Sequence, residues 1–188
     1  MQKSLNDIAT IQTGIYAQTA LNSEIIYLQA KHFSEKGQFL GPVHPDIPLD
    51  SKTEKHLLKH GDVLFSAKSS KNFATWYESK NGLAVASSTF LVIRIKDNFK
   101  EKIIPEYVVW FINHPDSQRW LKKSATGTNM PSISKAVLQN LKIYVPDIKT
   151  QKLILEIKRL RDLEINLNEQ VQNLKEQQIQ HQIINSIK

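Results

Sequence analysis

Two short polar segments contain most of the side chains that could bind a phosphate or a nucleic-acid base. The first, GDVLFSAKSSKN, spans residues 61–72, and the second, LKKSATGTNMPS, spans residues 121–132. Lysine attracts phosphates whatever the base sequence, whereas Asn, Ser and Thr side chains can bridge to phosphates or to base edges. The residues predicted to contact nucleic acid are Lys68, Ser69, Lys71, Asn72, Lys122, Lys123, Thr128 and Asn129.

The overall charge of the chain favours a polyanionic partner. Lys and Arg total 25 against 18 Asp and Glu, which gives a formal net charge of +7 and a pI near 9.5. Such a balance promotes association with nucleic acid or with an anionic membrane surface, but it carries no information about the fold. Two ordinary polar surface loops in a basic protein would contain the same residues, so both interpretations stand at this point.

Patterns for catalysis or metal binding are weak. The chain has no Cys, which excludes disulfides, thiolate zinc sites and cysteine nucleophiles. It also lacks the glycine-rich motifs of dinucleotide and triphosphate sites, and the Asn/Asp-Pro-Pro-Tyr motif of amino-methyltransferases. His56 and His60 have the i, i+4 spacing of two metal ligands on one helical face, but no third ligand follows closely. A solvated helix face is the alternative interpretation of these two histidines.

A nuclease-like pattern of acids and lysine occurs twice. The two sets are Asp46 with Glu78 and Lys80, and Asp147 with Glu156 and Lys158. A metal-dependent nuclease needs carboxylates that converge on a metal from rigid elements. Glu156 and Lys158 lie two positions apart on a predicted helix and so point in different directions, and Asp46 lies in a Pro-rich loop. We therefore predict no catalytic residue and no metal site.

Short strands are expected to position the first polar segment. Residues 1–82 contain small apolar runs separated by turn-rich segments, which predicts short strands joined by long loops. Residues 53–60, TEKHLLKH, are the one stretch there that suits a helix. The strongest strand signal is STFLVIRI at residues 88–95, which is β-branched and apolar, with Arg94 expected to face away from the core.

Helices are expected to position the second polar segment. Pro105 and Pro115 each occupy a helix-opening position, and a serine cap at Ser132 or Ser134 predicts a third, shorter helix. The run KIYVP then predicts a closing strand. We therefore predict a mixed α/β (α+β) domain with a mixed β-sheet and short helices over residues 1–146.

Residues 147–188 have a different composition. From residue 149 to residue 187 there is no Gly and no Pro, which predicts one long helix of about 60 Å. Apolar residues recur at alternating steps of four and three if Glu164 is accepted as one polar position, and this is the pattern of a coiled coil. The residues predicted to mediate dimerisation are Leu153, Ile157, Leu160, Leu167, Val171 and Leu174.

The alternative is a terminal helix that packs back on its own domain. A domain of 146 residues has a radius of gyration of about 15 Å, so much of a 60 Å helix would protrude from it, and an exposed stripe of Leu and Ile favours a covering partner helix. The amino end lacks the apolar core of a signal peptide and no stretch approaches the length of a membrane span. A cytoplasmic protein is the resulting expectation.

Four segments in this order resemble the target recognition domain and following helix of type I restriction-modification specificity (S) subunits. SLNDIATIQTG resembles the family's opening, in which a short strand leads into a glycine, and GDVLFSAKSS resembles its central strand and loop. ATGTNMPSISKAVLQNLKIYVPDIKTQKLI resembles its most diagnostic segment, with Gly127, Pro146 and Gln151 at the matching positions. The long helix is the fourth. PDIKTQ departs slightly from a family pattern that often has a second Pro and acidic residues there.

The resemblance implies a non-catalytic DNA-recognition subunit. Its recognition domain would recognise one half of a bipartite site in double-stranded DNA, and its helix would pair antiparallel with a second helix, which sets the spacing between two half-sites. Partner methyltransferase (M) subunits would bring S-adenosylmethionine, and partner restriction (R) subunits, where present, would use ATP and Mg. The chain itself would bind no cofactor. An assembly or regulatory module that dimerises or sequesters methyltransferase subunits without recognising DNA is the alternative.

One departure from the family pattern is large. A full S subunit resembles two such units in tandem, whereas this sequence contains one recognition domain and one helix. The chain is then either half of a longer protein or a natural half-subunit. In the second case the free helix predicts a homodimer that recognises an inverted, interrupted repeat, because half-site symmetry mirrors protein symmetry.

Overall fold

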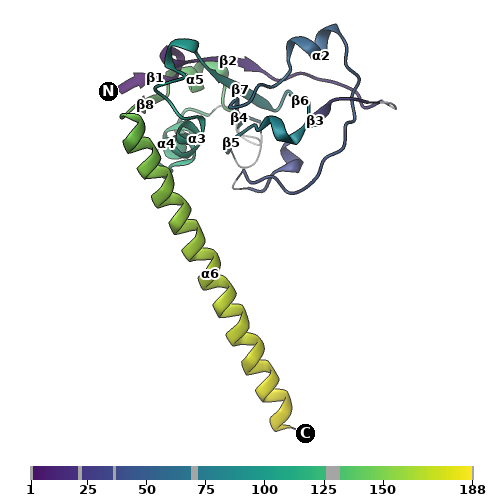
Figure 1. The fold of residues 1–188 in the computed structure, drawn as a ribbon, viewed down its shortest axis with the longest axis vertical. Coiled ribbons are helices and arrows are strands. Elements are labelled where there is room, and N and C mark those ends of the chain that lie inside the picture. Colours follow the sequence, from purple (N-terminus) through teal and green to yellow (C-terminus); the bar gives the residue numbers. More distant parts are fainter. Residues whose placement is uncertain (1, 21–22, 36, 69–71, 126–131, 188) are drawn as a thin grey trace. The chain divides into compact units, whose positions relative to one another are not determined.

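The structure is a computed structural model with the mixed α/β fold and the long C-terminal helix that the sequence predicts (Figure 1). The chain divides into two compact units, Met1–Ile148 and Lys149–Lys188. Within the described part of the chain, no helix is both long enough and apolar enough to cross a bilayer. The residues that the structure describes are 2–20, 23–35, 37–68, 72–125 and 132–187.

A four-stranded antiparallel sheet forms the centre of the first unit, with the strand order β2-β7-β4-β5. Its strands are β2 (Ala9–Thr13), β4 (Val63–Ser66), β5 (Ala74–Trp76) and β7 (Phe90–Ile95). All four residues of β4 are buried, because this strand lies between two others and is covered on both faces. β5 lies at the edge of this sheet, and no other strand of the described residues pairs with its outer side. The strand predicted over residues 88–95 is confirmed as β7.

Two smaller sheets complete the first unit. β3 (Ile26–Leu28) pairs in parallel with β6 (Ala84–Ala86), and all six residues are buried. β1 (Gln2–Ser4) pairs antiparallel with β8 (Lys142–Tyr144), which confirms the predicted closing strand and places the two ends of this unit side by side (Figure 1). α1 (Leu5–Ile8) follows β1 directly, and the Ser4 N–H donates a hydrogen bond to the Asp7 carboxylate at its start.

An aromatic cluster fills the core next to the end of the first polar segment. The Phe33 ring lies 5.9 Å from the Phe73 ring and 5.8 Å from the Phe90 ring, measured between centroids. Phe73 and Phe90 also contact each other edge to face. Such pairs add to the stabilisation from apolar burial. They fix the backbone at Phe73, where the polar segment returns to the sheet.

Gly14 is explained by a close approach between two backbone segments. A Cβ atom at this position would lie 2.1 Å from the Ser87 carbonyl oxygen and 2.5 Å from the Ala86 carbonyl oxygen. The backbone at Gly14 also donates to Phe90 O at 3.0 Å, so the segment cannot move away without losing this hydrogen bond. Only glycine therefore fits directly after β2.

We expect Gly14→Ala to destabilise the first unit by about 2 kcal/mol, because the new methyl group overlaps backbone atoms that cannot rotate aside. The free energy of unfolding in urea measures this loss. Gly41→Ala is a useful comparison, since Gly41 has a φ of +139° but no atom within 4 Å of a built Cβ. Its cost should be the smaller of the two, and an equal cost would show that steric overlap is not the reason for Gly14.

The helices of the first unit begin where the prolines and caps predict. α3 (Pro105–Asn113) and α4 (Pro115–Lys123) each start at a proline, and α5 (Lys135–Asn140) starts after Ser134, whose hydroxyl accepts from the Val137 N–H at 3.2 Å. The Tyr107 hydroxyl donates to Tyr144 O at 2.7 Å and so connects α3 to β8, and burial raises the pKa of this phenol. The shorter helices are α2 (Ser51–Lys55), η1 (Ala30–His32), η2 (Ser79–Asn81) and η3 (Asp97–Phe99).

The helix predicted over residues 53–60 is shorter than expected. α2 begins at an Asp50 cap, which accepts from the Lys52 and Thr53 N–H groups, and it ends at Lys55. The Leu58 N–H donates to Ala84 O at 2.9 Å, and the Leu58 side chain is buried. Pairing of this segment with β6 thus ends the helix before its second turn.

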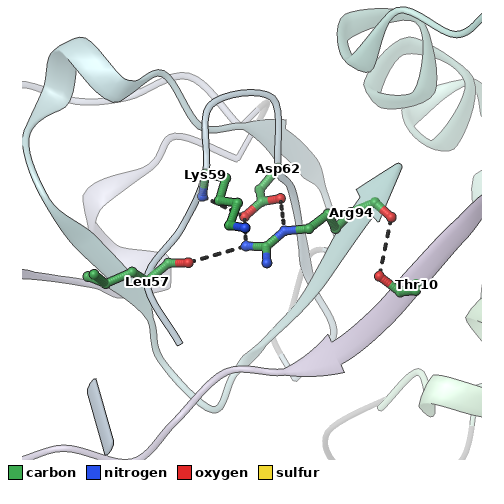
Figure 2. Close-up of polar contacts among 5 residues, drawn as sticks. All are labelled: Thr10, Leu57, Lys59, Asp62 and Arg94. Atoms are coloured by element: carbon green, nitrogen blue, oxygen red, sulfur yellow. Dashed lines mark hydrogen bonds and ion pairs between the residues drawn. The ribbon is translucent and has the colours of Figure 1, made fainter. Parts of the chain in front are cut away.

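The prediction that Arg94 faces away from the core is incomplete. Its guanidinium lies half-buried and makes two hydrogen bonds to the Asp62 carboxylate, Nε to Oδ1 at 2.8 Å and Nη2 to Oδ2 at 2.6 Å (Figure 2). It also donates to Leu57 O at 3.2 Å, and Asp62 accepts from the Lys59 N–H at 2.7 Å. Hydrogen bonding to Asp62 raises the pKa of Arg94. The Gly-Asp before β4 therefore supplies the partner that allows a cation on this strand.

α6 (Ile148–Ser186) is one helix of 39 residues. At 1.5 Å per residue it is about 58 Å long. Ion pairs such as Arg161 to Glu164 at 2.6 Å and Arg159 to Glu156 at 2.7 Å lie along its surface. The long helix predicted from the absence of Gly and Pro is confirmed.

Candidate nucleic-acid interface

The two polar segments predicted to bind nucleic acid meet in the structure. Lys68 forms an isolated antiparallel bridge with Ser132, and the Ile133 N–H donates to Ala67 O at 3.0 Å. Lys68 lies two residues after the end of β4 and is exposed, while Ser132 is half-buried. We call this contact the Ile133 junction. It brings together chain positions that are more than sixty residues apart, which no local pattern could predict.

The start of the first segment is fixed by further backbone hydrogen bonds. Thr89 O accepts from the Ala67 N–H at 2.9 Å and from the Lys68 N–H at 3.3 Å. The Thr89 hydroxyl lies 2.7 Å from the Ser87 hydroxyl, so this turn before β7 is itself held in place. The Lys68 ammonium is thus carried by a backbone that contacts two other segments.

Asn72 has a structural hydrogen bond within the segment. Its side-chain Nδ2 donates to Ser66 O at 2.8 Å, and the Ser66 N–H donates to Phe73 O at 2.8 Å. These bonds close the base of the excursion between β4 and β5. The sequence predicts a DNA contact for Asn72, and the structure places it at the base of the segment, where its amide group holds the two strand ends together.

Lys122 and Lys123 lie in the last turn of α4 and are both exposed. Cations are favoured there, because the carbonyl end of a helix carries partial negative charge. Trp120 on the same helix is 39% exposed, and the i, i+3 spacing places it on the same side as Lys123. An exposed aromatic face beside a lysine can stack on a base, so Trp120 is a further candidate residue that the sequence pattern alone does not single out.

A second contact connects the helices to the sheet. Asn113, the last residue of α3, accepts from the Ala74 N–H and donates to Ala74 O, both at 2.8 Å. Ala74 is the first residue of the edge strand β5. We call this contact the Asn113 junction. Asn113 and Ile133, which flank α4 and the second polar segment, thus bind Ala74, just after the first polar segment, and Ala67, within it.

Four of the predicted contact residues fall outside the part of the chain that the structure describes. These are Ser69, Lys71, Thr128 and Asn129. The structure describes the other four residues that were predicted to contact DNA, which are Lys68, Asn72, Lys122 and Lys123. Their DNA contacts stay a prediction.

The histidines and acids considered for metal chemistry have other contacts. α2 ends before His56, so His56 and His60 do not share a helical face; His60 packs edge to face on Trp76 and accepts from the Ser79 N–H. Asp46 accepts from the Tyr27 N–H at 2.7 Å, and Glu78 pairs with Lys80 at 2.9 Å. Across the described residues, no group of three or more His, Asp and Glu side chains could hold a metal ion.

The residues predicted to mediate dimerisation are exposed. We call them the seam. Their exposed fractions are 59% for Leu153, 58% for Ile157, 49% for Leu160, 51% for Leu167, 46% for Val171 and 64% for Leu174. A row of large apolar side chains this exposed on a single helix is characteristic of a surface that another helix covers.

The first unit is thus a mixed α/β domain in which two basic segments meet, and the long helix that follows it in the chain carries an exposed apolar seam. The family model described as the type I restriction modification DNA specificity domain matches residues 1–177. The chain therefore belongs to this family. No curated protein matches the chain.

Several solved structures share the fold. The S subunit of the type I restriction-modification system from M. genitalium has a TM-score of 0.59 and 10% identity, over 86% of this chain and 38% of that one. The HsdS subunit from Thermoanaerobacter tengcongensis has a TM-score of 0.61 and 14% identity, over 88% and 38%. A structure that concerns complex assembly and conformational transition of the type I R-M system has a TM-score of 0.68 and 14% identity, over 96% and 43%. This chain thus spans about two fifths of each.

Proposed function

We propose that this chain is a sequence-specific DNA-recognition subunit of a type I restriction-modification system, and that it has no catalytic activity of its own. The observation that carries the proposal is the junction between the two basic segments, within a chain that belongs to the DNA specificity family. Lys68, Lys122 and Lys123 would contact phosphates, and the neighbouring hydroxyl and amide groups would contact bases. Such a domain recognises one half of a bipartite site.

A second copy of the chain would supply the other half of the site. Each of the three solved structures described above is more than twice as long as the region that it shares with this chain, which leaves room for two such units. In the proposal, the seam of one copy pairs antiparallel with the seam of the other, and the paired helices set the distance between two recognition domains. The dimer would then recognise an inverted repeat interrupted by unspecified bases.

The partners in this proposal are double-stranded DNA, methyltransferase subunits and, where present, restriction subunits. S-adenosylmethionine, ATP and Mg would be bound by those partners. A cytoplasmic location is part of the proposal, because the DNA lies there. The assembly-module alternative, in which the chain sequesters methyltransferase subunits without recognising DNA, differs in one measurable respect: it needs no phosphate contacts.

The salt dependence of DNA binding tests this difference. We expect a linear decrease of log K with log salt concentration, with a slope that falls in magnitude by about 0.9 for each phosphate-contacting lysine removed. Lys68→Ala and Lys123→Ala should each reduce the slope by this amount for cognate and random duplexes alike. Lys80→Ala is the control, because Lys80 pairs with Glu78 and is not part of the candidate interface. A wild-type chain that binds without salt dependence would favour the assembly module.

A further inference from the structure

Asn113 uses its side chain as a neighbouring β-strand would use its backbone. On its outer side the edge strand β5 pairs with no other strand in the part of the chain that the structure describes. The Asn113 carboxamide satisfies both backbone groups of Ala74 there, as acceptor and as donor at 2.8 Å. Buried backbone groups at a sheet edge need such partners. Because a carboxamide carries one acceptor and one two-hydrogen donor, Asn matches this pair whereas Ala, Ser or Leu would not.

The two junctions flank the same two stretches of chain, residues 68–73 and residues 114–132. Ala74 follows the first polar segment and is bound by Asn113, which precedes α4. Ala67 lies within the first polar segment, directly before Lys68, and its carbonyl oxygen accepts from Ile133, which follows the second polar segment. The described residues at the two junctions are therefore joined directly, Ala67 to Ile133 and Ala74 to Asn113, and a shift of either pair along the sheet would break these hydrogen bonds.

We infer that Asn113 is a positioning residue for base discrimination, and that the two polar segments act on DNA as one unit held by the Asn113 and Ile133 junctions. This inference rests on the DNA-recognition function proposed above. Discrimination between bases needs donors and acceptors held at fixed positions, whereas attraction to phosphates needs charge alone. Loss of a junction should therefore reduce specificity and leave non-specific binding intact.

The test compares two duplexes with wild-type chain and with Asn113→Ala. One duplex is selected by the wild-type chain from a randomised library, and the other is a scrambled duplex of the same composition. Asn113→Ala should bind the selected duplex about tenfold more weakly, the equivalent of losing one or two modest hydrogen bonds. It should bind the scrambled duplex as well as wild type does, because Lys68, Lys122 and Lys123 are retained.

Gln118→Ala is the matched control. Gln118 lies on α4, and its side-chain Nε2 donates to Ile112 O at 2.9 Å. This substitution also removes hydrogen bonding from a side-chain carboxamide to the backbone, within the same pair of helices. The lost hydrogen bond does not involve the polar segments. Discrimination between the two duplexes should be unchanged in this variant. An equal loss in Gln118→Ala and Asn113→Ala would mean that general loosening of the helices is the cause, and it would overturn the inference.

Amide hydrogen exchange on the wild-type chain keeps the inference testable if Asn113→Ala does not fold. The Ala74 and Ile133 amides, one at each junction, should slow together when the selected duplex is added, and by less with the scrambled duplex. Slowing at one junction alone would overturn the idea of a single unit. A wild-type chain that binds neither duplex would defeat the proposed function itself, whereas a discriminating wild type with an equally discriminating Asn113→Ala would overturn only the role of Asn113.

Discussion

Replacing Leu160 and Leu167 together by Glu is expected to turn the proposed dimer into a monomer and to weaken binding to a duplex with both half-sites by at least about 100-fold. Both side chains are about half exposed in the single chain, so the substitutions cost little within one copy. In an antiparallel pair they would place four carboxylates in an apolar contact, and burial of unpaired charge is strongly unfavourable. Light scattering at tens of micromolar measures the mass.

The binding loss has a specific cause that a half-site duplex can isolate. Two linked recognition domains gain affinity because the second binding event is intramolecular. A monomer loses this gain but keeps the affinity of its single recognition domain. Affinity for a duplex with one half-site should therefore be the same for wild type and for the Leu160→Glu, Leu167→Glu variant. A parallel loss on the half-site duplex would indicate that the substitutions act on the recognition domain and not on pairing.

A control variant with the same added charge uses Asn166 and Asn173. At 100° per residue these positions lie more than about 120° around α6 from the mean direction of the seam, and both are exposed. Asn166→Glu with Asn173→Glu should leave the mass and the affinity for both duplexes close to wild type. A wild-type chain that is monomeric at tens of micromolar would remove the spacing role of the helix and would favour a function that needs no second copy.

Replacing Asp62 by Ala is expected to destabilise the first unit by about 3 kcal/mol. The Asp62 side chain is 2% exposed and accepts two hydrogen bonds from Arg94 and one from the Lys59 backbone (Figure 2). Its removal leaves the guanidinium without its partner in a half-buried site. The Arg94 side chain is 30% exposed, so water can recover part of the loss, which keeps the cost at the low end for a broken buried pair. Urea unfolding measures the difference.

Asp97→Ala tests whether burial is the reason for this cost. Asp97 also pairs with a cation, Lys100 at 2.6 Å, but its side chain is 93% exposed. Ion pairs in such exposed positions contribute little, because water competes for both charges. Asp97→Ala should therefore unfold like wild type. If both variants lost similar stability, the contribution of the Asp62 pair would have to come from its charge alone and not from its buried geometry.

The same experiments separate stability from recognition. Asp62 directly precedes β4, and Arg94 lies in the neighbouring strand β7. Their ion pair is therefore at the opposite end of β4 from Lys68. Asp62→Ala should therefore lower the unfolding free energy without changing the ratio of affinities for selected and scrambled duplexes at a temperature where the variant is folded. Asn113→Ala should change that ratio. If Asp62→Ala changed the affinity ratio and Asn113→Ala did not, Asp62 would be the residue that positions the interface and Asn113 would contribute to stability alone.

The sequence by itself determined the elements that follow from local chemistry. Pro105 and Pro115 open helices because proline fits the first helical turn, and Ser134 caps a helix because its hydroxyl accepts from a free N–H group. The 39-residue α6 follows from a stretch without Gly or Pro. The order of four characteristic segments along the chain also indicates the family, and the match of the family model over residues 1–177 confirms it.

The tertiary structure alone decided which distant residues meet. The Ile133 junction, the Asn113 junction and the Arg94 to Asp62 pair join positions that are 32 or more residues apart. Such hydrogen bonds depend on the register of whole strands and helices, and no periodic pattern in the chain encodes them. The same reason shortened the helix predicted over residues 53–60, since pairing of Leu58 with β6 outweighed local helix propensity. Local chemistry thus fixed the parts, and long-range pairing decided how they join.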